Sequence, residues 1–135
     1  MNNYLIFRTD RIGDFFISLI LIKSIIKNDQ KAEITLVASK KNYQYIKNSK
    51  YLKNVYLLKD NIINKLTLFS KLNKKKYKSI IIHDNKQRSK IISFFLKSEK
   101  KININHIKDI NHIDIIKFIL KSLNFNFTDD ALDTL

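Results

Sequence analysis

The sequence predicts a single α/β domain with a parallel sheet, and three observations support this prediction. Apolar runs of strand length alternate along the chain with apolar residues at helical spacing. The run Ser79–Ile82 (SIII) is apolar on both faces, as expected of a central parallel strand. Of the 135 residues 44% are hydrophobic, which is enough for one core. Right-handed crossovers would place helices on both faces of the sheet.

Each element is predicted from its own pattern. Short apolar and β-branched runs predict five strands, at Tyr4–Phe7, Glu33–Ala38, Asn54–Leu58, Ser79–Ile82 and Lys101–Ile104. Apolar residues three or four apart predict five helices, at Asp14–Lys27, Lys41–Lys47, Ile62–Leu72, Lys86–Leu96 and His112–Leu123. We expect the strand order 3-2-1-4-5. The domain would cover residues 1–124, and the polar tail 125–135 is expected to fray.

The faces of two helices are also predicted. In the fourth helix we expect Ile91, Ile92, Phe95 and Leu96 to point inward. In the last helix, apolar residues from Ile113 to Leu123 form one face. We expect that face to be exposed and to drive self-association.

The chain is strongly basic, with a net charge of +14, and residues 71–101 hold eleven Lys or Arg against two acids. One interpretation is an anionic partner such as nucleic acid, phospholipid or a phosphorylated glycan. The other is codon bias, because the chain has 23 lysines, 24 isoleucines and 15 asparagines. Cysteine is absent, so disulfides and thiolate metal sites are excluded. The apolar stretch Phe15–Ile22 is too short to span a bilayer, which takes roughly 20 residues.

In a sheet of this order, ligands bind beyond the carboxyl ends of the strands where the order reverses. The loops expected there are Arg8–Asp14 (RTDRIGD) and His83–Gln87. Gly13 is the only glycine and would permit a tight turn and close approach of a ligand.

Asp14 falls in the first turn of a helix, where a carboxylate is favoured by the helix dipole. It is either ordinary helix-terminus chemistry or a general base for a sugar hydroxyl. The loop is neither a dinucleotide fingerprint nor a P-loop.

These residues carry a family resemblance. The loop of the form R-x-D-R-x-G-D, the strand AEITL and the later segment SIIIHDNKQRSKIISFFL together resemble family 9 glycosyltransferases, the bacterial heptosyltransferases of lipopolysaccharide synthesis. The resemblance covers roughly residues 4–105. One departure is that the first helix lacks the proline usual in the family.

The resemblance implies one half of a GT-B glycosyltransferase, in which two Rossmann-like domains face one cleft. This chain would be the N-terminal, acceptor-binding half, and the C-terminal, donor-binding domain would be absent. We therefore expect no cofactor in this chain, because the nucleotide-sugar, typically ADP-heptose, would bind the missing domain. The chain alone is expected to be inactive.

The resemblance also implies roles for individual residues. Asp14 would be the catalytic base that deprotonates the acceptor hydroxyl. The expected substrate-binding residues come from the two loops and the helix that follows the second: Arg8, Thr9, Asp10, Arg11, Gly13, His83, Asp84, Arg88 and Ser89.

Expected partners are an anionic glycan or lipid-linked acceptor, and a separate donor-binding half or a second copy. We expect a cytoplasmic location with peripheral contact to the inner membrane. No metal is expected, because His83, His106 and His112 lack metal-ligand spacing. The alternative is a non-catalytic basic α/β module that binds nucleic acid or an anionic surface. Nucleic acid is the less favoured partner, because the tyrosines lack the pattern of an RNA-binding sheet.

Overall fold

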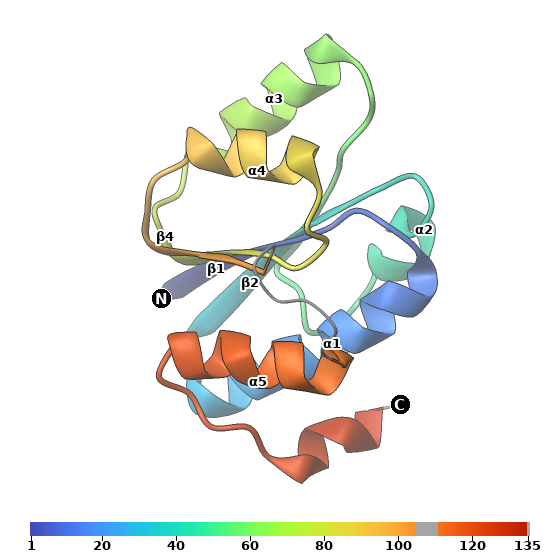
Figure 1. The fold of residues 1–135 in the computed structure, drawn as a ribbon. Helices are drawn as coiled ribbons and strands as arrows, with labels where there is room; N and C mark the ends of the chain where they lie inside the picture. The colour runs from blue at the N-terminus through green and yellow to red at the C-terminus, as the bar shows by residue number, and fades with distance from the viewer. Residues whose placement is uncertain (105–110, 135) are drawn as a thin grey trace.

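The computed structural model describes residues 1–104 and 111–134, so His106 lies outside the described residues. The five strands are β1 (Asn2–Arg8), β2 (Ala32–Ala38), β3 (Asn54–Leu57), β4 (Tyr77–Ile82) and β5 (Ser98–Asn103). The helices are α1 (Ile12–Asn28), α2 (Tyr43–Ile46), α3 (Ile62–Leu72), α4 (Gln87–Phe94), α5 (His112–Ser122) and the 3-10 helix η1 (Asp129–Thr134). The strands form one parallel sheet in the order β3-β2-β1-β4-β5, which confirms the predicted fold class and strand order (Figure 1).

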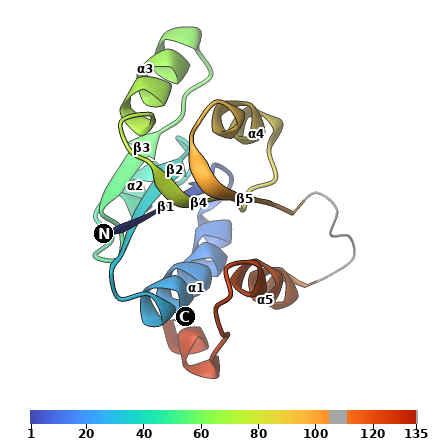
Figure 2. The ribbon, with the colours of Figure 1, turned by 90° about the vertical axis from the view of Figure 1, so that its left-hand side faces the viewer.

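The sheet lies between two helical layers, with α3 and α4 on one face and α1 and α5 on the other (Figure 2). Alternate residues of β1 pack against the two helical layers, because successive side chains of a strand point to opposite faces of the sheet. Leu5 and Phe7 belong to the core under α3 and α4, whereas Tyr4 and Ile6 belong to the core against α1 and α5. All four are fully buried. The central strand therefore has no solvent-facing side, which explains its continuous apolar sequence.

Helix α1 is the element that fixes the start of the candidate site. Leu21, Ile22 and Ile25 are fully buried against the sheet, and they anchor the helix along its length. Because β1 ends at Arg8 and α1 begins at Ile12, only three residues connect them. The first turn of α1 is therefore held at the carboxyl edge of the sheet.

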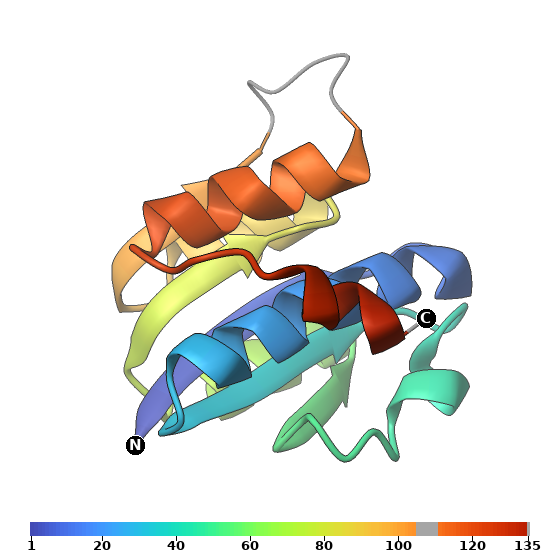
Figure 3. The same cartoon turned by 90° about the horizontal axis from the view of Figure 1, so that it is seen from below.

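The residues after α5, for which we expected a frayed tail, lie packed against the domain. The segment crosses the outer surface of the α1–α5 layer (Figure 3). Phe125 and Phe127 pack against the core, and Ala131 of η1 is buried. The tail is polar on average, but two phenylalanines are enough to attach it because each buries a large apolar area.

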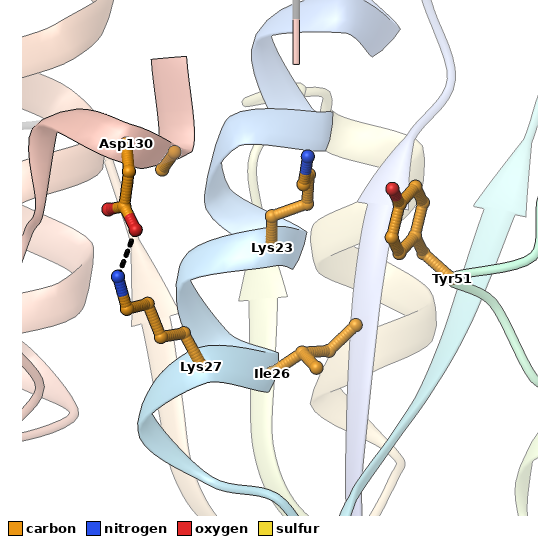
Figure 4. A pocket seen from close by; sticks show the side chains of 6 residues that line it. Lys23, Ile26, Lys27, Tyr51 and Asp130 are labelled. Atoms are coloured by element: carbon orange, nitrogen blue, oxygen red, sulfur yellow. Dashed lines mark hydrogen bonds and ion pairs between the residues drawn. The ribbon is translucent and has the colours of Figure 1, made fainter. Parts of the chain in front are cut away.

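Polar contacts also join the tail to α1. Asn28 exchanges two hydrogen bonds with the backbone of Asn126, at 2.9 and 3.1 Å. Lys27 forms an ion pair with Asp130 beside a shallow apolar pocket between Lys23 and Tyr51 (Figure 4). The tail thus contacts α1 at Asn126 and again at Asp130.

Two predictions about helix faces were also wrong. The last helix is not exposed, since Ile116, Ile119 and Leu120 are fully buried against α1 and the sheet. In α4, Ile92 and Leu96 point inward as predicted, but Ile91 and Phe95 are exposed by 54% and 64%. Within the described ranges, no helix is long and apolar enough to cross a bilayer.

Candidate functional site

The candidate site lies at the carboxyl edge of the sheet, where β1 and β4 are neighbours but lead to opposite helical layers. The end of β1 leads into α1, and the end of β4 leads into α4 (Figure 1). The two connecting loops meet here because their strands are paired in register, with Phe7 opposite Ile82. This is the switch point that the strand order predicts for a ligand site.

Arg8 is the centre of the site. Its side chain is only 4% exposed, yet it contacts two carboxylates: Nε lies 3.4 Å from Asp10 Oδ1, and Nη2 lies 3.6 Å from Asp14 Oδ1. Nε also donates to the backbone carbonyl of Asp14 at 3.0 Å, and Nη1 donates to that of His83. Burial lowers the pKa of Arg8, and the nearby carboxylates oppose that shift. The buried Arg8 side chain therefore connects the loop after β1 to the end of β4.

Asp14 occupies the first turn of α1. Its Oδ2 accepts a hydrogen bond from the backbone N–H of Arg11, the N-cap residue, at 3.4 Å. The side chain is 29% exposed, so one side of the carboxylate reaches solvent. The helix dipole favours a negative charge at this position. The structure thus presents an accessible carboxylate that is oriented by Arg8 and by its own helix.

Asp10 is a second carboxylate at the same arginine. Burial raises its pKa, and the neighbouring charge of Asp14 adds to this increase, whereas Arg8 opposes it. The buried Oδ1 has no hydrogen-bond partner in the part of the chain that the structure describes. A carboxyl with a raised pKa is a candidate for proton transfer. Sequence reasoning assigned Asp10 to substrate binding only, because burial cannot be read from the motif.

Gly13 does not have the conformational role predicted for it. It lies within α1, its φ is not positive, and a Cβ added there would meet nothing within 4 Å. The tight turn is made without it. What the glycine leaves is open space beside Asp14, into which a ligand can approach the helix N-terminus.

Asp84, which follows β4, links the loop after β4 to the loop after β1 by hydrogen bonds. Its Oδ2 accepts hydrogen bonds from the backbone N–H of Thr9 at 3.1 Å, from the Thr9 hydroxyl and from the Ser89 hydroxyl at 2.7 Å. Its Oδ1 accepts from the backbone N–H of Lys86 at 3.1 Å. The next residue, Asn85, has a φ of 53°, a left-handed conformation that asparagine tolerates. Thr9, Asp84 and Ser89 are all buried, so their hydrogen bonds hold the loops together.

His83 lies deeper than the loop it begins. Its ring is 3% exposed, and Nδ1 lies 2.7 Å from the hydroxyl of Ser18 in α1. Burial, followed by the charge of Arg8, lowers its pKa well below the usual value. The ring is therefore neutral at physiological pH, and its visible role is to join β4 to α1.

Arg88 lines a pocket of about 310 Å³ next to these loops. Its Nη2 donates to the carbonyl of Thr9 at 2.6 Å, and its Nη1 lies 3.8 Å from Asp60. The pocket lies over the ends of β1, β2 and β3. The full lining is Thr9, Ser39, Lys40, Lys41, Leu58, Lys59, Asp60 and Arg88.

Three lysines of this pocket were not predicted. Lys40 and Lys41 follow β2, and Lys59 follows β3, so the parallel sheet brings all three to one edge. Their ammonium groups form no ion pair within the described ranges. The signal was available, because each lysine lies within three residues of the end of a predicted strand. Asp14 does not line this pocket; the loop of residues 9–11 lies between them, and Ser39 donates to the carbonyl of Asp10 at 3.1 Å.

The structure thus brings together most of the predicted residues, but in different ways. Arg8, Thr9, His83, Asp84 and Ser89 are buried, whereas Arg11 and Gly13 are exposed at the start of α1. In the described part of the chain, no group of three His, Cys, Asp or Glu side chains is arranged to hold a metal ion.

No family model matches the sequence, and no curated protein sequence matches it. Solved structures do match. The E. coli heptosyltransferase WaaC with ADP-2-deoxy-2-fluoro heptose has a TM-score of 0.77 at 13% identity, over 94% of this chain and 50% of that chain. The same enzyme with ADP also gives 0.77 at 13% identity, over 94% of this chain and 49% of that chain. A glycosyltransferase of family 9 from Veillonella parvula DSM 2008 has a TM-score of 0.71 at 14% identity, over 95% of this chain and 42% of that chain. The chain therefore spans about half the length of these enzymes and has the fold of a glycosyltransferase Rossmann-like half.

Proposed function

We propose that this chain is the acceptor-binding half of a heptosyltransferase-like glycosyltransferase, with Asp14 as its general base. One observation carries the proposal. An accessible carboxylate, oriented by a buried arginine, stands at the ligand-binding edge of a fold that matches half of a heptosyltransferase. The resemblance of the RTDRIGD loop to family 9 assigns the catalytic role to that same carboxylate.

In the proposed reaction, Asp14 removes the proton from an acceptor hydroxyl. The oxygen then attacks the anomeric carbon of the donor sugar, and the nucleoside diphosphate leaves with the electrons of the broken bond. The contact between Arg8 and Asp14 orients the carboxylate, and a general base must be positioned within reach of the hydroxyl it deprotonates. The donor nucleotide-sugar would bind a second Rossmann-like domain, because this chain spans only about half the length of the similar enzymes.

The proposed acceptor is anionic, either a lipopolysaccharide core or a related lipid-linked glycan. Support comes from the pocket beside the site, where Lys40, Lys41 and Lys59 join Arg88. We propose a phosphate or carboxylate of the acceptor as the partner of the three lysines, because clustered cations favour an anion over a neutral sugar. Thr9 and Ser39 supply hydroxyl groups at the same edge.

Calorimetric titration of the chain with deacylated lipopolysaccharide core oligosaccharide tests this proposal. We expect binding that the Lys40→Gln/Lys41→Gln variant weakens about ten-fold or more, since each charge-assisted contact contributes roughly 1.5–3 kcal/mol. Lys121→Gln, an exposed lysine of α5 on the other face, is the matched control and should bind normally.

Binding of two further ligands distinguishes a glycosyltransferase half from a non-catalytic basic module. ADP should not bind, because the proposal places the donor on another domain. Tight binding of duplex DNA with a steep salt dependence, together with no binding of the oligosaccharide, would instead support a non-catalytic basic module.

A further inference from the structure

The outer surfaces of α3 and α4 expose large apolar side chains that the fold does not cover. On α3 they are Ile62, Ile63 and Leu66, exposed by 74%, 78% and 65%. On α4 they are Ile91, Phe94 and Phe95, exposed by 54%, 73% and 64%. Both helices lie on the same side of the sheet (Figure 2). We call this surface the α3–α4 face, and its apolar residues are these six.

On the opposite side of the sheet the large apolar side chains are less exposed. The tail packs against α1, Ile116, Ile119 and Leu120 of α5 are buried, and Phe16 of α1 is 49% exposed. On α4, Ile91, Phe94 and Phe95 line one shallow apolar hollow, with Lys90 at its border. Scattered exposed apolar residues are common, but three that line one hollow beside a lysine indicate an interaction surface.

The charge of this surface identifies the kind of partner. Residues 61–98, which contain α3 and α4, hold ten Lys or Arg and a single acid, Asp84. That acid is buried and fully used in hydrogen bonds with the two loops, so it does not offset the lysines. Lys101 lies over the ring of Phe94, with Nζ 6.0 Å from the ring centre. Cations therefore outnumber acids around these apolar side chains, and the exposed acids that flank this segment are Asp60, which pairs with Arg88, and Glu99.

We propose that the α3–α4 face docks the chain on an anionic lipid bilayer. The aromatic and aliphatic side chains would enter the boundary between headgroups and acyl chains, while the lysines meet lipid phosphates. A second copy of the chain is a poorer occupant, because a face-to-face dimer would bring two cationic surfaces together. This proposal is independent of sugar transfer and does not involve Asp14.

A tryptophan probe tests where the face lies. The chain has no tryptophan, so Phe94→Trp places a single indole on α4 and Tyr45→Trp places one on α2. Phe94 and Tyr45 have the same exposed fraction, 73%, which makes the pair matched. With vesicles of phosphatidylcholine and phosphatidylglycerol, we expect a blue shift and quenching by brominated lipids for Phe94→Trp only. Equal responses from both probes, or none from either, would overturn the proposal.

Vesicle co-sedimentation separates the apolar and charged contributions. The Phe94→Ser/Phe95→Ser variant should lose roughly ten-fold or more in affinity for the mixed vesicles, because two apolar side chains are removed. Tyr45→Ser should bind normally. Lys90→Gln should weaken binding more than Lys121→Gln, and salt should weaken binding by the wild type.

Three outcomes count against the proposal. Equal binding to pure phosphatidylcholine would remove the requirement for anionic lipid. Unchanged binding by the double serine variant would place the contact elsewhere. A dimer in sedimentation equilibrium that the same variant dissociates would show that a second copy occupies the face.

Discussion

Arg8 Nη2 lies 3.6 Å from Asp14 Oδ1 while the arginine itself is buried beneath the loop that carries the aspartate. The cation that orients the candidate base is therefore part of the core. This arrangement differs from a surface ion pair, which contributes little because water screens it. Here the same guanidinium also contacts Asp10 and the carbonyl of His83, so one buried cation serves both the candidate base and the contact between the two loops.

Replacing Arg8 with methionine should destabilise the domain by up to about 3–5 kcal/mol, because it removes a buried guanidinium and leaves two partly buried carboxylates without their cation. Denaturant unfolding monitored by circular dichroism measures the loss. Adding Asp10→Asn to Arg8→Met should recover part of it, since one of the two unpaired carboxylates is removed. Arg11→Met is the control, because Arg11 is exposed, and it should change the free energy of unfolding by no more than about 0.5 kcal/mol.

Asp14→Asn should leave the fold intact and reduce sugar transfer by about 10²–10⁴, the usual contribution of a general base. The assay requires a complex that supplies the donor-binding half. Acceptor affinity should stay nearly constant, because the amide keeps the size of the carboxylate. Asp10→Asn is the matched variant at the same arginine. If Asp10→Asn abolishes turnover and Asp14→Asn does not, the base is Asp10, whose pKa burial already raises.

His83 predicts a specific dependence of stability on pH. Its pKa in the folded chain lies well below the ordinary value of 6.5, so the unfolded chain binds the proton more tightly. This contribution to stability is fully present above about pH 6.5, the unfolded pKa, and is lost as pH falls below it toward the folded pKa. The slope for one proton is at most about 1.4 kcal/mol per pH unit.

Denaturant unfolding of wild type and His83→Asn between pH 8 and 5, a window set by the His pKa of about 6.5, measures this term. Asparagine can replace Nδ1 as the partner of Ser18, so the fold should persist. The difference between the two proteins should shrink as pH falls, because only the wild type loses stability through this group. A pH-independent difference would contradict a buried neutral imidazole. His112→Asn, at an exposed position, should reduce the slope only slightly, because the charge of His112 is the smallest of the three causes that lower the pKa of His83.

Gly13→Ala separates a backbone requirement from a ligand requirement. Because a Cβ at this helical position meets nothing within 4 Å, we expect stability to be unchanged or to rise by up to about 1 kcal/mol. If a ligand uses the open space beside Asp14, the same variant should weaken acceptor binding. Thermal unfolding and calorimetric titration of one preparation distinguish the two effects. Loss of stability would mean that glycine is needed for the turn after all.

Local patterns were sufficient for the elements and their order. The apolar run Ser79–Ile82 identified a central strand, and apolar spacing located α3 at its observed bounds, Ile62–Leu72. These predictions succeed because strand and helix periodicity depend on neighbouring residues alone. The position of Asp14 in the first turn of α1 follows from the same local reasoning.

Other features depend on segments far apart in the chain. The burial of Arg8 depends on His83, 75 residues away, and the pocket of Lys40, Lys59 and Arg88 depends on three strands ending at one edge. The exposure of Phe95 was not predicted. An apolar residue at helical spacing is assigned to the core unless it is known which face of the helix packs against the sheet.

By itself, then, the sequence determined a parallel α/β domain and a carboxylate at the start of its first helix. Only the tertiary structure decided which arginine orients that carboxylate, which lysines surround the neighbouring pocket and which apolar faces stay uncovered. The physical reason is that periodicity is a local property of the chain. Burial, ion pairing and exposure are set by which distant segments the sheet brings together.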